Sequence, residues 1–307
     1  MMGRAITNKI IEHNKTTGSR VSEGKGQEQI FFRQCLRLSG LLIMIIAFFM
    51  PSFAQERSVP FHAGEQLNFN IYFKYGIVMA KAGTAEYKIS NSNYSGKPAI
   101  KTELTFKTVP AFDRIYKVRD TLWTYISQDL RPLYHEKGLH EGKTSYREEM
   151  FYMNHSEQFS KVRSIRRTRE TIKFDTLLFS NHIGYDMLSF FIYARILDFQ
   201  NLSVGETESL VCFVGRDVVK MRMRNAGQTI LEKNELEKIK TIRFEIDVID
   251  KAFEDNKNAL EIWITDDKNR IPVKIKAKLK IGAMEAELSS VKNLKHSFDA
   301  RIVIKPR

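Results

Sequence analysis

The sequence predicts a mainly β fold, with antiparallel, strongly curved sheets that form a half-barrel or a two-lobed sandwich packed on one central helix. Three observations predict it. Apolar and polar residues alternate with a period of two over most of the chain, one segment has helical periodicity, and no Pro- or Ser-rich linker divides the strands. Hydrophobic residues make up 43% of the 307 residues, which is enough to build a core.

The clearest predicted strands have one apolar and one polar face. Leu67, Phe69, Ile71 and Phe73 alternate with polar residues, and residues 272–281 alternate apolar residues with lysines. Such alternation indicates an antiparallel sheet with one packed and one solvated face. The same pattern predicts strands at residues 83–89, 99–106, 120–127, 145–153, 161–173, 208–214, 218–224, 241–249, 260–265 and 284–290.

The helix is predicted near residues 184–199. Leu188, Phe191 and Ile192 fall on one helical face, and Asp186 stands near the start, where an acidic side chain favours the helix dipole. Because the segment is apolar nearly all round, we expect it to be buried against a sheet.

Arg195 is the one charge on the apolar stripe of this helix. A buried charge needs a partner, and Asp120 and Asp186 are the candidates. Arg195 then either anchors the helix to the sheet or lies at the mouth of a ligand cavity.

Residues 1–54 have the pattern of an N-terminal extension plus a secretory signal peptide. The apolar run 38–49 follows Arg33 and Arg37, and Ser52 and Ala54 form a small-x-small cleavage pattern. The run is shorter than the about 20 residues of a spanning helix. We expect cleavage, a single β-rich domain at 55–307 and a periplasmic location in the cell envelope; an uncleaved membrane anchor is the alternative.

Two cysteines refine this prediction. Cys35 precedes the apolar run, whereas the lipid-bearing cysteine of a lipoprotein follows it, so we expect no lipoprotein. Cys212 would be the one thiol of the exported chain. Its flanks Val211 and Phe213 suit a buried strand position, and a reactive nucleophile is the alternative.

The formal charge of +13 favours anionic partners such as lipid head groups, lipopolysaccharide phosphates or acidic glycans, unless it serves solubility alone. We do not expect an exported protein to bind nucleic acid. Three rows of cations could form one positive surface on neighbouring strands, or could be neutralised across strands by Glu245, Asp247 and Glu261. The rows are Lys274, Lys276, Lys278 and Lys280; Lys161, Arg163, Arg167 and Arg169; and Lys220, Arg222 and Arg224.

No motif for a cofactor, metal or catalytic group stands out. His135 and His140 are five residues apart, whereas the zinc motif needs four, and we interpret Asp266-Asp267 as turn formers. We therefore predict no cofactor, no metal and no catalytic residue. Candidate cavity-lining residues are Phe69, Phe73, Trp123, Phe191, Met221 and Met223.

Four stretches resemble the family catalogued as domain of unknown function 3108. They are residues 61–73 with Gly64-Glu65, the helix with Asp186, Leu188 and Arg195, residues 202–206, and residues 260–288 with Trp263, Asp266-Asp267, Arg270-Ile271-Pro272 and Gly282. The resemblance spans roughly residues 59–295. It implies export and a β-sheet fold similar to the open half-barrels of periplasmic lipoprotein carriers, and no catalytic residues.

The leading functional hypothesis is non-catalytic binding of a hydrophobic or amphipathic envelope ligand, a lipid or acyl chain. Its candidate ligand-binding residues are Lys274, Lys276, Lys278, Lys280, Arg195 and Trp123. The alternative is an envelope structural or assembly factor that acts through protein contacts. A third hypothesis is an enzyme acting on glycans through acids such as Glu65, Asp120 or Glu148.

Overall fold

The computed structural model describes residues 59–156, 158–197, 202–249, 258–279 and 281–304, whose strands form one sixteen-stranded β-sheet. The predicted mainly β class is therefore confirmed. The strands are β1 (Gln66–Tyr75), β2 (Val78–Tyr94), β3 (Lys97–Thr108), β4 (Arg119–Ile126), β5 (Pro132–Glu141), β6 (Thr144–Ser156), β7 (Phe159–Arg167), β8 (Ile172–Ser180), β9 (Gly184–Tyr185), β10 (Thr207–Val214), β11 (Asp217–Asn234), β12 (Glu237–Ile249), β13 (Leu260–Thr265), β14 (Pro272–Lys278), β15 (Ala283–Lys292) and β16 (Arg301–Val303). The helices are α2 (Pro110–Asp113) and α3 (Met187–Ile196).

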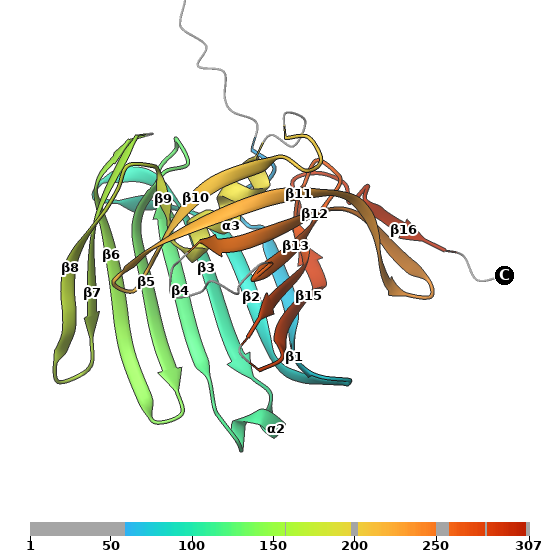
Figure 1. Cartoon of the computed structure of the whole chain (residues 1–307), viewed down its shortest axis with the longest axis horizontal. Coiled ribbons are helices and arrows are strands. Elements are labelled where there is room, and N and C mark those ends of the chain that lie inside the picture. Colours follow the sequence, from blue (N-terminus) through green and yellow to red (C-terminus); the bar gives the residue numbers. More distant parts are fainter. Residues whose placement is uncertain (1–58, 157, 198–201, 250–257, 280, 305–307) are drawn as a thin grey trace, which may run out of the picture. The chain divides into compact units, whose positions relative to one another are not determined.

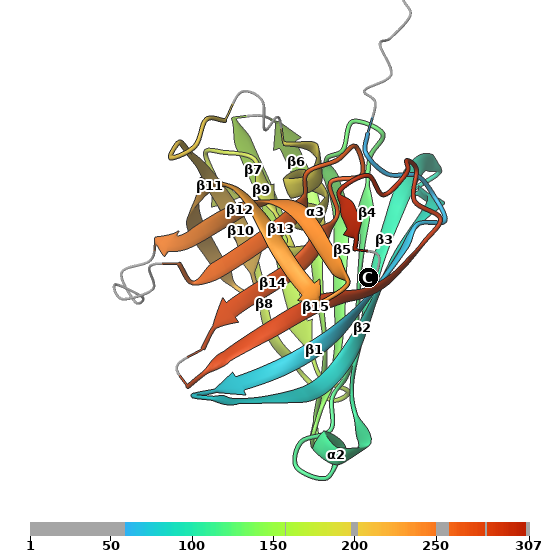
Figure 2. The same ribbon diagram turned by 90° about the vertical axis from the view of Figure 1, so that its right-hand side faces the viewer.

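The sheet curves into a nearly closed barrel (Figures 1 and 2). Its strand order is β8-β7-β6-β5-β4-β3-β2-β1-β15-β14-β13-β12-β11-β10-β9, and β16 pairs with β12 off this path. Neighbours are antiparallel except β9 and β10, which pair in parallel. The prediction of antiparallel sheets in a half-barrel or two-lobed sandwich is corrected in these two respects: the sheet is mixed, and it nearly closes.

The two ends of the sheet meet through side chains. The Ser164 hydroxyl on β7 donates to the Gly215 carbonyl in the β10–β11 turn at 2.6 Å, and the Gly215 amide donates to a Glu148 carboxylate oxygen on β6 at 3.2 Å. The Gly184 amide on β9 donates to the Ser160 hydroxyl on β7 at 2.9 Å. These bonds satisfy polar groups that a continuous ladder would otherwise pair, so the β10–β11 turn sits on the inner face of β6 and β7.

Several strands follow the predicted alternation, but four were missed, of which β9 and β16 are only two and three residues long. On β1 the side chains of Leu67, Phe69 and Ile71 are buried as predicted. The strands β5 and β8 were not predicted. The sequence of β5 does not alternate regularly between apolar and polar residues. Gly138 suggested a turn, but it lies within the strand, opposite Thr121. β8 was merged with β7 because no Gly or Pro separates them.

Helix α3 lies inside the curved sheet, as predicted for the central helix (Figure 1). It is shorter than the predicted segment, and residues 198–199 lie outside the described part. Asp186 is its N-cap: the carboxylate accepts from the Leu188 and Ser189 amides, and the Ser189 hydroxyl accepts from the Asp186 amide. This capping box satisfies amides that would be unpaired at a buried helix start.

Arg195 anchors α3 to the sheet, and its partner is Glu65 rather than the expected Asp120 or Asp186. Both side chains are fully buried, with Nη1 to Oε1 at 2.5 Å and Nη2 to Oε2 at 3.0 Å. Nη2 also donates to the Asn269 carbonyl at 2.8 Å, and the guanidinium lies 5.2 Å from the Phe61 ring. One cation therefore joins the segment before β1, the helix and the β13–β14 turn.

Cys212 is buried on β10, as expected for a structural thiol, and burial raises the pKa of the thiol. In the ranges that the structure describes, no helix is both long and apolar enough to cross a membrane. The predicted signal peptide, Cys35 and the 54/55 boundary lie outside the described residues and stay predictions.

We expect Glu65→Gln to lower the free energy of unfolding by about 3–5 kcal/mol, because it leaves the Arg195 charge buried without a counter-charge. Asp175→Asn is the matched control. It breaks another two-bond arginine–carboxylate pair, with Arg163, that is exposed to solvent and so contributes much less. Urea denaturation of both variants measures the difference, and equal losses would contradict a special role for the buried pair.

Candidate ligand cavity

An apolar cavity of about 540 Å³ lies between α3 and the inner face of the sheet. Its volume falls within the range of about 300–1,000 Å³ that is usual for small-molecule sites. Strands from both halves of the chain contribute its walls, and α3 contributes one side. The lining includes Phe69, Tyr87, Phe106, Leu122, Phe191, Ile262 and Met284.

The pleat of the strands explains why the wall is apolar. Successive side chains point to opposite faces, so Phe69 and Ile71 on β1 face the same side as Ala286 on β15, which pairs with Ile71. From the helix, the Phe191 ring packs against Tyr87 with 4.5 Å between ring centroids. The wall also includes small residues, among them Ala85, Ala194 and Ala277.

Three acidic or basic residues line this otherwise apolar space, and two of them lie close together on β4 and β5. Asp120 and Lys137 line the cavity beside Leu122, whose cross-strand partner is Lys137. Burial raises the pKa of Asp120, although its carboxylate accepts from the His140 amide at 3.0 Å. Lys137 forms no salt bridge with any described residue. The third is Glu285, which is held by Lys274. The missed strand β5 is the reason that sequence analysis did not place Lys137 here.

The residues predicted to line a cavity are only partly brought together. Phe69 and Phe191 line it, but Trp123, Phe73, Met221 and Met223 are not among its described lining residues. Trp123 lies on the opposite face of β4, with the Lys101 ammonium 5.5 Å from its ring. Arg195 also lies apart from the lining, and its two Nη atoms are bonded to Glu65 and Asn269. Ligand binding by Trp123 or Arg195 stays a prediction without structural support.

The three basic rows do not form one positive surface. They belong to β14, β7 and β11, which are not neighbours in the sheet. Acids on adjacent strands neutralise several members: Lys274 pairs with Glu285 at 2.7 Å, Lys276 with Glu261 at 3.2 Å, and Arg224 with Glu245. Lys278 is exposed near the end of β14, and Lys280 lies outside the described residues. The interpretation of cross-strand neutralisation therefore holds for Glu261 and Glu245.

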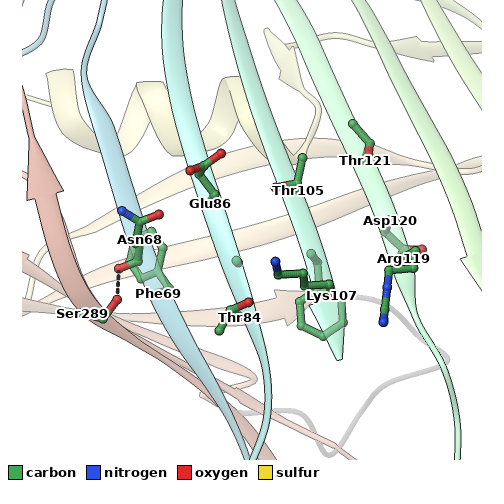
Figure 3. A pocket seen from close by; sticks show the side chains of 12 residues that line it. Asn68, Phe69, Thr84, Glu86, Thr105, Lys107, Arg119, Asp120, Thr121 and Ser289 are labelled. Carbon is green, nitrogen blue, oxygen red and sulfur yellow. Dashed lines mark hydrogen bonds between the residues drawn. The ribbon is translucent and has the colours of Figure 1, made fainter. Parts of the chain in front are cut away.

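A second hollow of about 470 Å³ opens on the other face of β1–β4, and most of the residues that line it are polar. Figure 3 shows Asn68, Glu86, Thr105 and Lys107 around it. The Ser289 hydroxyl donates to the Asn68 carbonyl at 3.0 Å on its edge. Phe69 and Phe106 contribute to its wall, but the wall of the cavity beside α3 is almost entirely apolar, so that cavity is the better site for an apolar ligand.

A buried polar cluster fixes the start of α3 beside the cavity. The Asp186 carboxylate accepts from Thr124 at 2.7 Å and from Tyr152 at 3.2 Å, and it lies 3.2 Å from the His135 ring nitrogen. Burial alone would raise the pKa of Asp186, but His135 and these hydrogen bonds together hold it well below its usual range. His135 thus has a structural partner and lies on the inner face of β5.

Other candidate chemistry is already engaged. Glu65 holds Arg195, and Glu148 holds Arg166 at 2.5 Å, so two of the three acids proposed for glycan chemistry are committed to arginines. Asp267 accepts from Thr265 and from the Asn269 and Arg270 amides, as a turn former does. Among the described residues, no cluster of three His, Cys, Asp or Glu could hold a metal ion.

The fold and cavity define a class, the barrel-like β proteins with an internal apolar space. More particularly, the chain belongs to the family described as protein of unknown function (DUF3108), whose model matches residues 68–289. Among solved structures it is similar to the crystal structure of a β-barrel-like protein of the domain of unknown function DUF1849 from Brucella abortus. The identity is 11%, the coverage is 76% of this chain and 99% of that chain, and the TM-score is 0.50. At this identity the similarity shows the fold alone, and no curated protein matches the chain.

We expect Asp186→Asn to lower stability in a pH-dependent way. Asparagine still caps a helix, so the substitution chiefly removes the charge beside His135. Because the folded-state pKa of Asp186 is depressed, the wild-type advantage is present above the unfolded value of about 3.9 and is lost as pH falls below it. Urea denaturation at pH 7 and pH 3 should show a smaller difference at pH 3. Asp129→Asn, in an exposed turn, is the control; a pH-independent loss in Asp186→Asn would contradict the prediction.

Proposed function

We propose that this protein is a non-catalytic carrier that binds a single acyl chain of a lipid or lipidated molecule inside its barrel. The apolar cavity beside α3 is the observation that carries the proposal. Its walls offer hydrophobic contact and few hydrogen-bonding groups, which suits a hydrocarbon chain better than a sugar or a nucleotide.

Energetic arguments support an acyl ligand. Each methylene moved from water to an apolar wall contributes ~0.8 kcal/mol, so a chain of about ten methylenes supplies ~8 kcal/mol, from which the entropic costs of association are subtracted. The cavity is bounded by packed strands and a capped helix, and such a largely preformed site limits the cost of ordering the protein.

Lys137 gives the proposed ligand an orientation. This residue lines the apolar space, and its ammonium forms no salt bridge with a described residue. Burial raises the pKa of the neighbouring Asp120 and the charge of Lys137 opposes that rise, so this acid is a weak partner for Lys137, and an anionic head group, a carboxylate or a phosphate, would be a stronger one. The proposed ligand is therefore an acyl chain with an acidic head group at Lys137.

We place this function in the periplasm, on the basis of the signal-like residues 38–54. The alternative is an assembly factor that acts through protein contacts. The arm formed by β11, β12 and β16 supports it, because Ile230, Leu236 and Val303 are exposed there. Mass spectrometry of lipid extracted from protein purified without detergent separates the two proposals. A stoichiometric acyl lipid supports the carrier, and a ligand-free protein favours assembly.

Filling the cavity should abolish acyl-chain binding. Ala277→Phe and Ala286→Phe add a ring at positions that line the cavity on β14 and β15, so we expect the affinity for a fluorescent fatty acid to fall by at least about tenfold. Ala111→Phe is the matched control, because Ala111 is exposed on α2. Fluorescence titration measures the affinities, and thermal unfolding shows that the variants are folded. Unchanged binding in both cavity variants would contradict the proposed site.

Removing the Lys137 charge should affect acidic ligands selectively. Lys137→Met removes the charge and keeps most of the length of the side chain, so we expect weaker binding of a fatty acid, by about tenfold, and little change for the fatty alcohol of the same length. Lys97→Met, at an exposed position in the β2–β3 hairpin, is the control. Competition against the fluorescent ligand measures both affinities. Equal losses for acid and alcohol would show that Lys137 does not recognise the head group.

A further inference from the structure

Three turns lie together at one end of the sheet. They are the β1–β2 turn, the β3–β4 connection with α2, and the β14–β15 turn. Because the strands that they connect are antiparallel neighbours in one sheet, all three lie at the same end of it. Figures 1 and 2 both show this end opposite the one where β1 begins. Lys74 pairs with Ala283, and the Val109 amide donates to the Ala82 carbonyl at 3.0 Å, so the three turns lie on adjacent strands.

All three turns expose apolar side chains. Ile77 at the first turn is 102% exposed, Ile115 at the second is 81% exposed and Ile281 at the third is 66% exposed. Further exposed apolar residues at these turns are Tyr75, Val78, Met79, Tyr116 and Leu279. Isolated exposed apolar residues need no explanation, but a set of this size at one end marks an interaction surface.

Cations flank these apolar residues. Lys74 and Lys81 bracket the β1–β2 turn, Arg114 precedes Ile115, and Lys278 precedes the β14–β15 turn; all four are exposed. Lys74, Lys81 and Arg114 form no salt bridge with a described residue, whereas Asp113, the acid on α2, is already paired with Arg119 at 2.6 Å. The three turns are thus apolar at their tips with cations around them, and an acid that contacts their exposed residues is Glu141 on β5, which accepts from the Tyr116 hydroxyl.

The cavity reaches toward this end. Ala277 and Met284 line it and pair with each other across β14 and β15, and the exposed Leu279 and Ile281 follow within a few residues on the same hairpin. The hairpin therefore forms part of the cavity wall at one point and of the exposed end at the next.

We infer that this end of the sheet docks onto an anionic lipid bilayer, with the tips around Ile77, Ile115 and Ile281 entering the interface and the surrounding cations binding acidic head groups. A bilayer fits separate apolar tips at different positions better than the flat face of one protein does. The positive charge around the tips is complementary to acidic lipids. The inference goes beyond the proposed function and stands without it.

Site-specific fluorescence tests this on the full chain. Cys35→Ser removes the cysteine outside the described residues, and buried Cys212 is protected, so a polarity-sensitive dye can be attached at Ile77→Cys or Ile115→Cys. Asn93→Cys, near the other end of β2, is the control. With vesicles of phosphatidylethanolamine and phosphatidylglycerol, we expect a blue shift at the two tip positions and none at Asn93. This readout is independent of any binding by residues 1–58.

Charge substitutions test the electrostatic contribution to binding of the anionic bilayer. In the labelled protein, Lys74→Gln, Lys81→Gln and Arg114→Gln together should raise the anionic lipid concentration needed for the shift by at least about tenfold. The control is a second triple variant, Lys97→Gln, Lys220→Gln and Arg222→Gln, which changes the net charge equally at exposed positions elsewhere. It should leave the required lipid concentration unchanged.

No shift at the tips, an equal shift at Asn93, or equal responses to phosphatidylcholine vesicles would overturn the inference. A concentration-dependent shift without vesicles would instead assign the surface to a second copy of the chain. Fatty-acid titration without vesicles distinguishes this failure from failure of the carrier, because it reports on the cavity alone.

Discussion

The buried ion pair between Arg195 and Glu65 is the contact on which the arrangement of helix and sheet depends. Two charges removed from water need good geometry and further hydrogen bonds, and here the Asn269 carbonyl supplies a further acceptor, although the buried Arg195 Nε has no partner among the described residues. The Asn269 amide in turn donates to the carbonyls of His296 and Ser297. Because these groups come from the start, middle and end of the described chain, the helix can occupy one position only.

The helix so fixed is too short to fill the barrel. Ten residues of α3 span ~15 Å, whereas the twelve residues of β3 span ~40 Å. Leu188 and Ile192 pack into one apolar cluster, and Phe190 and Ala194 into another, so the helix completes both near its own level. Beyond it the inner faces of the strands have no helix to cover them, and the cavity lies there.

Alternation of residue types was enough to predict the β class, the inward faces of β1 and β14 and the central helix. It could not predict closure, because that depends on contacts such as Ser164 with Gly215, which involve groups that carry no periodic signal. Arg195 was recognised as a charge that needs a partner, but Glu65 is 130 residues away in sequence. Lys137 was missed because polar residues and Gly138 obscure the strand that points it inward.

Small residues on the cavity wall bear on whether the space is functional. Strand interiors favour β-branched and aromatic residues, yet Ala85, Ala277 and Ala286 occupy inward positions facing the cavity. Larger side chains there would bury more apolar surface and pack against Phe191, so a barrel selected for stability alone would tend to fill the space. Unfilled volume beside a firmly anchored helix is the arrangement expected when the missing apolar surface is supplied by a ligand. The anchoring pair of Arg195 and Glu65 is not among the described lining residues, so it fixes the helix without interrupting the apolar wall.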